Sequence, residues 1–310
     1  MAQFPTNPAV IQSRNGNPEL LAWSQSDIEN RFGFKGGRHI GVNHVFAFII
    51  AVLLTGITYA LMVFILQRLP FANTLAAMML RPSNLYTMIP ATLFFFFGVA
   101  VLCLKSRKLK FQERALSLSA VPAEPEFVLT EATAATVLAR IHSLVDHPRH
   151  FVLLNRIDRA LSNLRNIGQV NDVSSILRAQ AENDEDQVAS SYTLLNGFVW
   201  AIPVLGFIGT VQGLSMAINQ FTQTLQASGD ISMIRSSLQG VTAGLATAFE
   251  TTLIALVLAL ILQLWITFQQ KREMSFLDEC NDYCHSHVVS KLRLIDRATA
   301  PVPMTPDSKP

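Results

Sequence analysis

Charged residues are scarce in this sequence. Only 15% of its 310 residues are Asp, Glu, Lys or Arg, whereas about 25% are charged in an ordinary soluble domain. The shortage is local, because four long stretches carry almost no charge and the charged residues lie between them. The formal net charge is only +2, so no strong basic field would attract nucleic acid. These shortages argue against a soluble domain and against a nucleic-acid partner.

Motifs of the common enzyme classes are also missing. The sequence contains no G-x-x-x-x-G-K-[ST], no H-E-x-x-H and no G-x-S-x-G. Cys280, Cys284, His285 and His287 resemble metal ligands. On one helix, however, the histidines point away from the face that the cysteines share, and no second cluster completes a tetrahedral site. We therefore expect no enzyme activity, no cofactor and no bound metal.

Four apolar runs are each long enough to cross a bilayer. They cover residues 44–66, 85–104, 194–218 and 241–268. A helix needs about 20 mostly apolar residues to span the hydrocarbon core. The first run is long and is not followed by an A-x-A-like site, so we do not expect it to be a cleaved signal peptide. The sequence predicts an all-α fold, a four-span helical membrane protein with helical cytoplasmic extensions.

The positions of Lys and Arg predict the orientation of the chain. Of the 24 basic residues, only Arg68, Arg81 and Arg235 lie in the two predicted outer loops. All the others lie in segments that are cytoplasmic if both chain ends are inside, which satisfies the positive-inside rule. The three cysteines then lie at or inside the cytoplasmic face, where structural disulfides are rare.

We divide the chain into six segments. They are a cytoplasmic N-terminal segment 1–43, an outer pair of spans 44–104, a cytoplasmic helical region 105–193, an inner pair of spans 194–268, a cytoplasmic helix 269–297 and a disordered tail 298–310. The two outer loops are short, about twenty residues each, so we expect this chain to build no folded domain on the outer face.

The sequence of the cytoplasmic region predicts three helices. Thr130 is a candidate cap for a helix over residues 130–146, and Pro148 is expected to open a second helix over 148–166. The third starts near Asn171 and runs into the third span. In the N-terminal segment, one short amphipathic helix is expected over residues 17–32.

Small and hydroxylated residues form a stripe on each of the last two spans. In the third span the stripe consists of Pro203, Gly206, Thr210, Gly213 and Ala217. In the fourth it consists of Gly240, Gly244, Ala248, Thr251, Ala255 and Ala259, with Thr247 and Thr252 beside it. Such stripes let helix backbones approach closely, and their hydroxyl groups either bond across helices or line a polar path. Pro203 acts as a hinge or as a static kink.

Glu250 is the acidic residue of the fourth span. A charge at the bilayer centre costs about 2.5–3.5 kcal/mol unless it is solvated, paired or protonated, and such residues are mostly functional. We therefore favour a role for Glu250 in ion transfer. The alternative is a glutamic acid that bonds a neighbouring helix.

The order of these residues resembles the MotA/TolQ/ExbB proton-channel family. Its TolQ and ExbB members carry a proline, a glycine-rich turn and G-T-V-x-G in one span, then V-x-x-G-[IL]-A and a threonine in the next. The first element is matched by Pro203, Gly206, Gly209, Thr210, Val211 and Gly213. The second is matched by Val241, Gly244, Leu245, Ala246 and Thr252. TolQ and ExbB proteins place a glutamate where this sequence has Thr247, whereas the acid here lies one helical turn later, at Glu250.

The resemblance implies a mechanism. Members of the family form a pentameric ring in the bacterial inner membrane, around a dimer of single-span MotB-, TolR- or ExbD-like partners that carry a membrane aspartate. Protons or sodium ions pass between ring and partner and drive mechanical work. The residues implied for the ion path are Thr210, Thr247, Glu250, Thr251 and Thr252. Those implied for helix packing or bending are Pro203, Gly206, Gly209, Gly213, Gly240 and Gly244.

Two other functions fit a four-span membrane protein. A secondary transporter would move its own substrate, but the internal repeats and broken helices typical of transporters are not visible in the sequence. A passive membrane scaffold would need no acid at position 250. A gene for a small single-span protein with a membrane aspartate, beside the gene for this chain, would favour the motor subunit over both.

Overall fold

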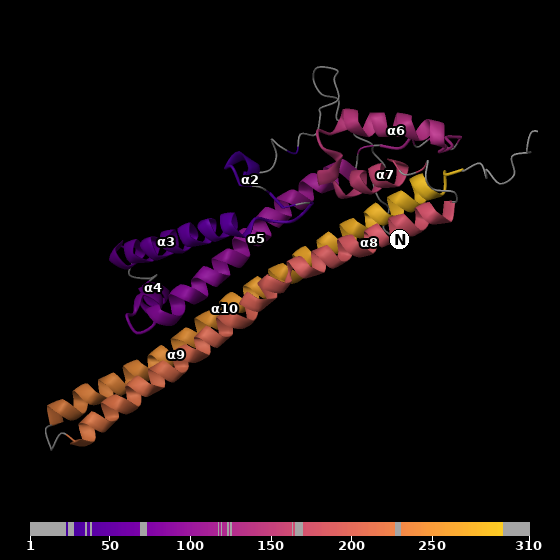
Figure 1. Ribbon diagram of the computed structural model, residues 1–310. Coiled ribbons are helices and arrows are strands. Elements are labelled where there is room, and N and C mark those ends of the chain that lie inside the picture. The colour runs from indigo at the N-terminus through magenta and orange to yellow at the C-terminus, as the bar shows by residue number, and fades with distance from the viewer. Residues whose placement is uncertain are drawn as a thin grey trace, which may run out of the picture. The chain divides into compact units, whose positions relative to one another are not determined.

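The computed structural model is built from helices (Figure 1). It describes residues 23, 28–34, 36–37, 39–68, 73–116, 118, 120–122, 124, 126–162, 164, 170–226 and 231–293. Within these residues no strand forms beyond one isolated bridge between Leu129 and Leu292. Four helices are long and apolar enough to cross a membrane. The predicted all-α, four-span membrane fold is therefore confirmed.

The chain divides into two compact units. The membrane unit consists of residues 34–109 and 185–275, and the polar unit consists of residues 1–33, 110–184 and 276–310. Three long helices, α5, α8 and α10, contribute residues to both units.

The first two spans of the membrane unit are α3 (His44–Arg68) and α5 (Leu85–Leu116). Their contact is aromatic, because the rings of His44 and Phe48 lie 6.3 and 6.5 Å from that of Phe97. A further helix, α4 (Asn73–Leu80), packs against α3 in the stretch that we predicted to be a loop. Its sequence, NTLAAMML, is mostly apolar and has no Gly or Pro. The segment therefore forms two helical turns, in which backbone N–H groups donate to backbone carbonyl groups of the same segment.

The other two spans, α9 (Thr193–Gln226) and α10 (Ile231–Cys284), run side by side (Figure 1). Their 34 and 54 residues give lengths of about 51 and 81 Å, well above a hydrocarbon core of about 30 Å. Most of the predicted outer loop of about twenty residues is helical, because only residues 227–230 separate the two helices. We predicted a loop there because the sequence becomes less hydrophobic, but polar residues such as Gln and Thr do not by themselves end a helix.

The polar unit contains α6 (Glu131–Leu144), α7 (Val152–Ser162) and the first part of α8 (Val170–Ser191). Thr130 caps α6 as predicted, with a reciprocal bond from Thr133. The single helix predicted from Pro148 is wrong. Pro148 opens only the 3₁₀ turn η1 (Pro148–His150), and α7 begins after it, where the Gln112 side chain accepts from the first N–H of the helix at 3.1 Å. Between α8 and α9, a single residue, Tyr192, interrupts the predicted continuous helix.

The C-terminal helix ends earlier than the predicted residue 297. After α10, the π-helical turn η3 (His285–Val289) follows, and the chain then pairs with the loop before α6. The Leu129 N–H donates to the Lys291 carbonyl at 2.8 Å, and this bond replaces helical bonding at that point. The predicted tail 298–310 lies outside the described residues.

Only part of the predicted N-terminal helix 17–32 is described. Trp23 is helical and α2 (Ile28–Arg31) is a short helix. The Trp23 ring is buried, and it stacks on the His150 ring at 5.6 Å. Its backbone N–H donates to the Asp146 carboxylate at 3.1 Å. At this residue the N-terminal segment is therefore docked on the polar unit, although we expected most of the segment to be loose.

Candidate functional site

The small-residue stripes of α9 and α10 face each other within one chain. A methyl group built at Gly206 would lie 2.6 Å from Cβ of Ala255. At Gly213 and Gly244 the nearest atom is a carbonyl oxygen of the opposite helix, 2.5 and 2.7 Å away. Only a hydrogen atom fits at these positions, so the two backbones pack as closely as small residues allow in a bilayer.

This packing predicts different outcomes for two glycine substitutions. Gly213→Ala should destabilise the chain by about 1–3 kcal/mol, because the new methyl group meets helix backbone and forces α9 and α10 apart. Gly56 on α3 is the matched control, since nothing lies within 4 Å of its added methyl group. Gly56→Ala should be neutral or stabilising by up to about 1 kcal/mol. Unfolding temperatures in detergent compare the two, and equal temperatures would contradict the close approach.

Two further predicted positions lie beside this contact. Gly240 lies against the side chain of Gln220, whose end can move aside more readily than backbone. Pro203 is half-buried inside α9, and the helix continues through it.

Three of the predicted ion-path threonines bond to helix backbone. Thr251 is fully buried against Gly209 and donates to carbonyl groups one turn back in α10. Thr252 donates to the Gly206 carbonyl of α9 at 3.2 Å, so it bonds across the two helices. Thr210 is half-buried and donates to a carbonyl of its own helix at 2.6 Å.

Thr247 and Glu250 lie against the turn that joins α4 to α5. The Thr247 hydroxyl is buried, 2.9 Å from the Ser83 hydroxyl. One Glu250 oxygen lies 3.1 Å from Nη2 of Arg81, and the other accepts from Nδ2 of Asn84 at 3.1 Å. Two polar groups of α10 thus contact three polar residues of this turn, Arg81, Ser83 and Asn84.

The Asn84 amide is held rigidly. Asn84 is fully buried, its Nδ2 also donates to the Met78 carbonyl at 2.8 Å, and its Oδ1 accepts from Ser83 at 3.1 Å. Its backbone N–H donates to the Arg81 carbonyl at 2.8 Å. Every polar group of this side chain is therefore bonded. The bonds to Ser83 and to the Met78 carbonyl set the orientation of the amide that Glu250 contacts.

The structure gives Glu250 a charged partner that we did not predict. We had interpreted Glu250 as the acidic residue of the fourth span, with a role in ion transfer or, alternatively, a bond to a neighbouring helix. Within one chain it lies against an ion-pair partner, and its side chain is 12% exposed. A sequence signal for the partner existed, since Arg81 is one of only three basic residues in the predicted outer loops. Nothing in the local pattern indicated which polar group it would meet.

A second polar cluster in the membrane unit was missed by sequence reasoning. Nζ of Lys105 on α5 lies 2.8 Å from Oε2 of Glu273 on α10, and both side chains are buried. The other carboxylate oxygen accepts from Gln269 at 3.2 Å, and the ammonium group lies 4.2 Å from the centre of the Tyr192 ring. We had interpreted Lys105 only as part of the positive cytoplasmic flank. Taking such a pair out of water is costly unless both ions are bonded, as they are here.

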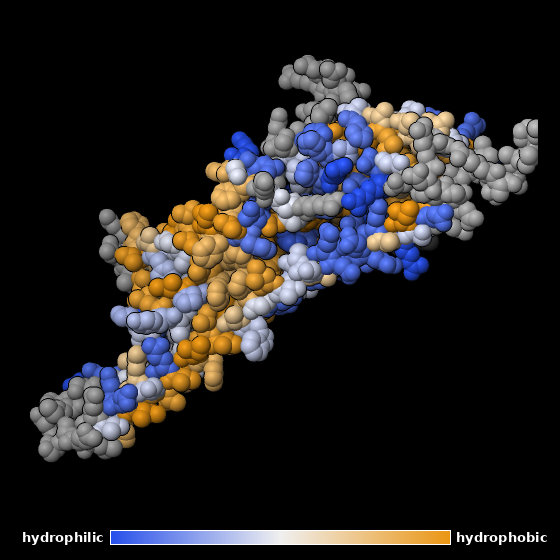
Figure 2. Space-filling model, viewed as in Figure 1, coloured by the Kyte–Doolittle hydropathy of each residue, from blue (hydrophilic) through white to orange (hydrophobic). Residues whose placement is uncertain are grey.

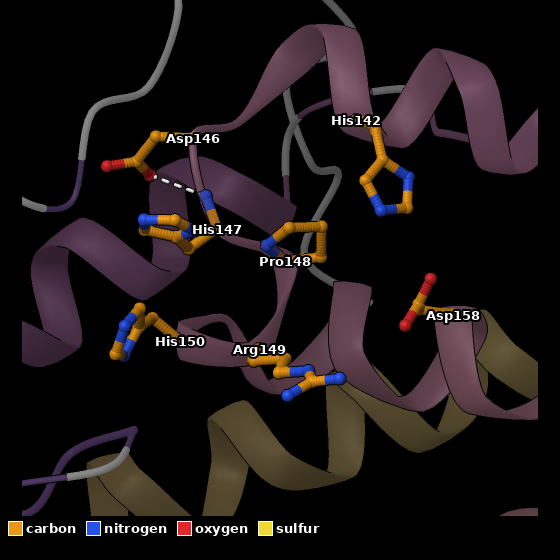
Figure 3. Close-up of a pocket in the computed structure, with 7 residues that line it drawn as sticks. All are labelled: His142, Asp146, His147, Pro148, Arg149, His150 and Asp158. Atoms are coloured by element: carbon orange, nitrogen blue, oxygen red, sulfur yellow. Dashed lines mark hydrogen bonds between the residues drawn. The ribbon is translucent and has the colours of Figure 1, made fainter.

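The polar unit contains a pocket of about 340 Å³ (Figure 3). His142 of α6 and Asp158 of α7 line one side of it. The connecting chain contributes the others, which are Asp146, His147, Pro148, Arg149 and His150. Cationic and anionic groups are mixed along this wall, so it favours no single class of ligand. In the described part of the chain, no group of three His, Cys, Asp or Glu side chains could hold a metal ion.

Apolar side chains remain exposed on the outer faces of α9 and α10. Figure 2 shows apolar residues gathered over the helices of the membrane unit. They recur every three or four positions, as a helix face requires. On α9 they are Trp200, Val204, Phe207, Val211, Leu214 and Ile218. On α10 they are Phe249, Leu253, Leu256, Leu260, Leu264 and Phe268. Faces of this size need lipid or protein to cover them.

Comparison with known proteins identifies the part of the chain that carries these features. A model of the MotA/TolQ/ExbB proton channel family matches residues 145–279, which include α7, α8, α9 and most of α10. Neither the curated proteins nor the solved structures contain a match. The matched region holds Thr247, Glu250 and both small-residue stripes, and it also holds Glu273. Residues 145–279 of this four-span membrane protein are therefore similar to the MotA/TolQ/ExbB proton channel family.

Proposed function

We propose that this chain is the ring-forming, ion-conducting subunit of a membrane motor driven by protons or sodium ions. The observation that carries the proposal is the family match over residues 145–279. The composition of the helices supports it, because α9 has no charged residue and Glu250 is the single acid between Arg235 and Lys271 on α10. An isolated acid in an apolar helix pair is the type of group that marks an ion pathway.

In this proposal, five copies assemble around a dimer of single-span partners of the MotB, TolR or ExbD type, whose membrane aspartate exchanges the ion with the ring. The protein lies in the bacterial inner membrane with both termini in the cytoplasm. Our first argument for the ring was the pair of small-residue stripes. Since these stripes already pack against each other inside one chain, the exposed apolar faces of α9 and α10 are what remains for neighbouring copies, the partner and lipid.

The oligomeric state tests the ring directly. Native mass spectrometry or cryo-electron microscopy of the protein in mild detergent is expected to show a pentamer, because the apolar faces stay covered when copies assemble. A stable monomer or dimer under the same conditions would contradict the proposal.

Ion conduction is the second half of the test. The complex of ring and partner, reconstituted in liposomes, should pass protons or sodium ions down an imposed gradient. A passive scaffold is the second candidate function, and one observation favours it. Both Glu250 oxygens are bonded within the chain, as a purely structural acid would be. An assembled complex that passes neither ion would favour the scaffold.

The proposed ion path runs along Thr210, Thr247, Glu250, Thr251 and Thr252. A cysteine at Thr210 or Thr252 should react with a small soluble thiol reagent faster than one at Phe95 on α5, because the first two positions would meet water in the assembled ring. The experiment requires a background without the three native cysteines, since Cys103 is exposed. Equal protection at all three positions would contradict a water-filled path beside these threonines.

A further inference from the structure

We infer that the Arg81 guanidinium is a built-in cation that occupies the Glu250 carboxylate, so that a transported cation binds this site only when Arg81 withdraws. The inference rests on the proposed function, because it concerns the ion that the ring conducts. It adds Arg81, Ser83 and Asn84, from the turn between α4 and α5, to the predicted residues Thr247 and Glu250.

The two partners of Glu250, Asn84 and Arg81, differ in how freely they can move away from it. Asn84 is buried, and its amide is bonded on both sides, so it cannot leave without breaking the turn. The Arg81 side chain is 34% exposed, and Glu250 is its only partner among the described residues. An arginine on a long, partly solvated side chain can reach water with its guanidinium group more readily than the buried Asn84 amide can. One carboxylate oxygen is therefore fixed and the other is available for exchange.

The groups around the carboxylate suit a small hard cation. Glu250 and Thr247 lie three positions apart on α10 and share a helix face. The Thr247 hydroxyl contacts the Ser83 hydroxyl at 2.9 Å, and Ser83 contacts the amide oxygen of Asn84. With Arg81 withdrawn, a carboxylate and hydroxyl oxygens remain, which are the ligands that hard cations prefer. A proton would bind the carboxylate alone, whereas Na⁺ would also use the hydroxyl oxygens.

The site lies at one end of the charge-free part of the membrane unit. On α10 no charged residue occurs from 251 to 270, and on α5 and the preceding turn none occurs from 82 to 104. The 20 residues on α10 correspond to about 30 Å of helix, the thickness of a hydrocarbon core. The Arg81–Glu250 pair bounds this part at one end, and the Lys105–Glu273 pair lies at the other. A cation from water at the first end can therefore reach Glu250 without crossing the apolar layer.

Arg81 is the only charged group that faces Glu250 among the described side chains. Helix α9 contains no charged residue. The nearest other charged residues on α10 are Arg235 and Lys271, 15 and 21 positions from Glu250, or about 22 and 31 Å along the helix. Competition for the carboxylate therefore depends on Arg81.

Carbodiimide labelling of Glu250, measured by mass spectrometry on the full chain in detergent, tests the inference without any need for motor function. Dicyclohexylcarbodiimide adds to protonated carboxyl groups in apolar surroundings. Arg81→Gln should increase the labelling rate of Glu250, because the ion-pair partner that lies 3.1 Å from one of its oxygens is removed. Arg81→Lys keeps a tethered cation and should stay close to wild type. Arg235→Gln removes the same charge elsewhere and should change nothing.

The outcomes separate the inference from the proposed function. Equal labelling of the Arg81→Gln and Arg81→Lys variants would overturn the inference, since shape and not charge would then protect Glu250. Unchanged labelling in Arg81→Gln would overturn it as well. In the Arg81→Gln variant, protection by added Na⁺ at constant pH identifies sodium as a cation that binds this site. Faster labelling together with a wild-type complex that conducts neither ion would leave the exchange site in place and reject the conducting ring.

Discussion

Replacing Glu250 by glutamine is expected to abolish ion-driven work and cation flux while the ring still assembles. Glutamine keeps the shape of the side chain, and its oxygen can still accept a bond from Arg81 or Asn84, which now lie 3.1 Å from the carboxylate. It cannot exchange a cation, because the carboxylate charge is gone. Flux into liposomes measures the loss, and native mass spectrometry shows whether the complex is intact.

The alanine variant at the same position separates the two roles of Glu250. Glu250→Ala leaves the buried Asn84 amide without one of its acceptors, and an unsatisfied buried group costs about 1–3 kcal/mol. If Glu250 only holds the turn to α10, glutamine should work nearly as well as glutamate and alanine should weaken assembly. Full activity of a normally expressed Glu250→Gln variant would therefore reject the ion-path role and leave the structural one.

Lys105→Met is expected to cause a large loss of stability. The Lys105 and Glu273 side chains are 3% and 0% exposed, and their charged atoms lie 2.8 Å apart. Without the ammonium group, the carboxylate stays buried and unpaired, which costs about 3–5 kcal/mol. The unfolding temperature in mild detergent should fall strongly, and the yield of intact protein should fall with it.

Two further variants show whether burial of the pair causes this effect. Lys105→Met combined with Glu273→Gln removes both charges and keeps an oxygen that can accept from Gln269, so stability should return close to wild type. Arg178→Met breaks an exposed pair with Glu182, whose side chains are 83% and 66% exposed, and should cost less than about 1 kcal/mol. If Lys105→Met were no worse than Arg178→Met, the buried pair would not be important for stability.

Several features could be predicted because they depend on short stretches of sequence. The four spans follow from apolar runs of sufficient length, and the cap at Thr130 follows from a threonine placed before a helical pattern. The resemblance to the MotA/TolQ/ExbB family depends on glycine, proline and threonine at fixed spacings in two adjacent spans, and the family match includes that region. The errors in helix ends, at the outer loop and after Pro148, arose where hydropathy or a single proline was used to place a boundary.

The sequence by itself thus determined the fold class, the number of spans and the resemblance to the family, since hydropathy and helical spacing are local properties. Only the tertiary structure decided that the two small-residue stripes face each other, that Arg81 meets Glu250 and that Lys105 meets Glu273. The partners in these two ion pairs are more than 160 positions apart, and the pattern around each residue is compatible with many partners. Which polar groups meet inside a bilayer depends on the rotation and register of packed helices, and these are set by the contacts of all the helices together.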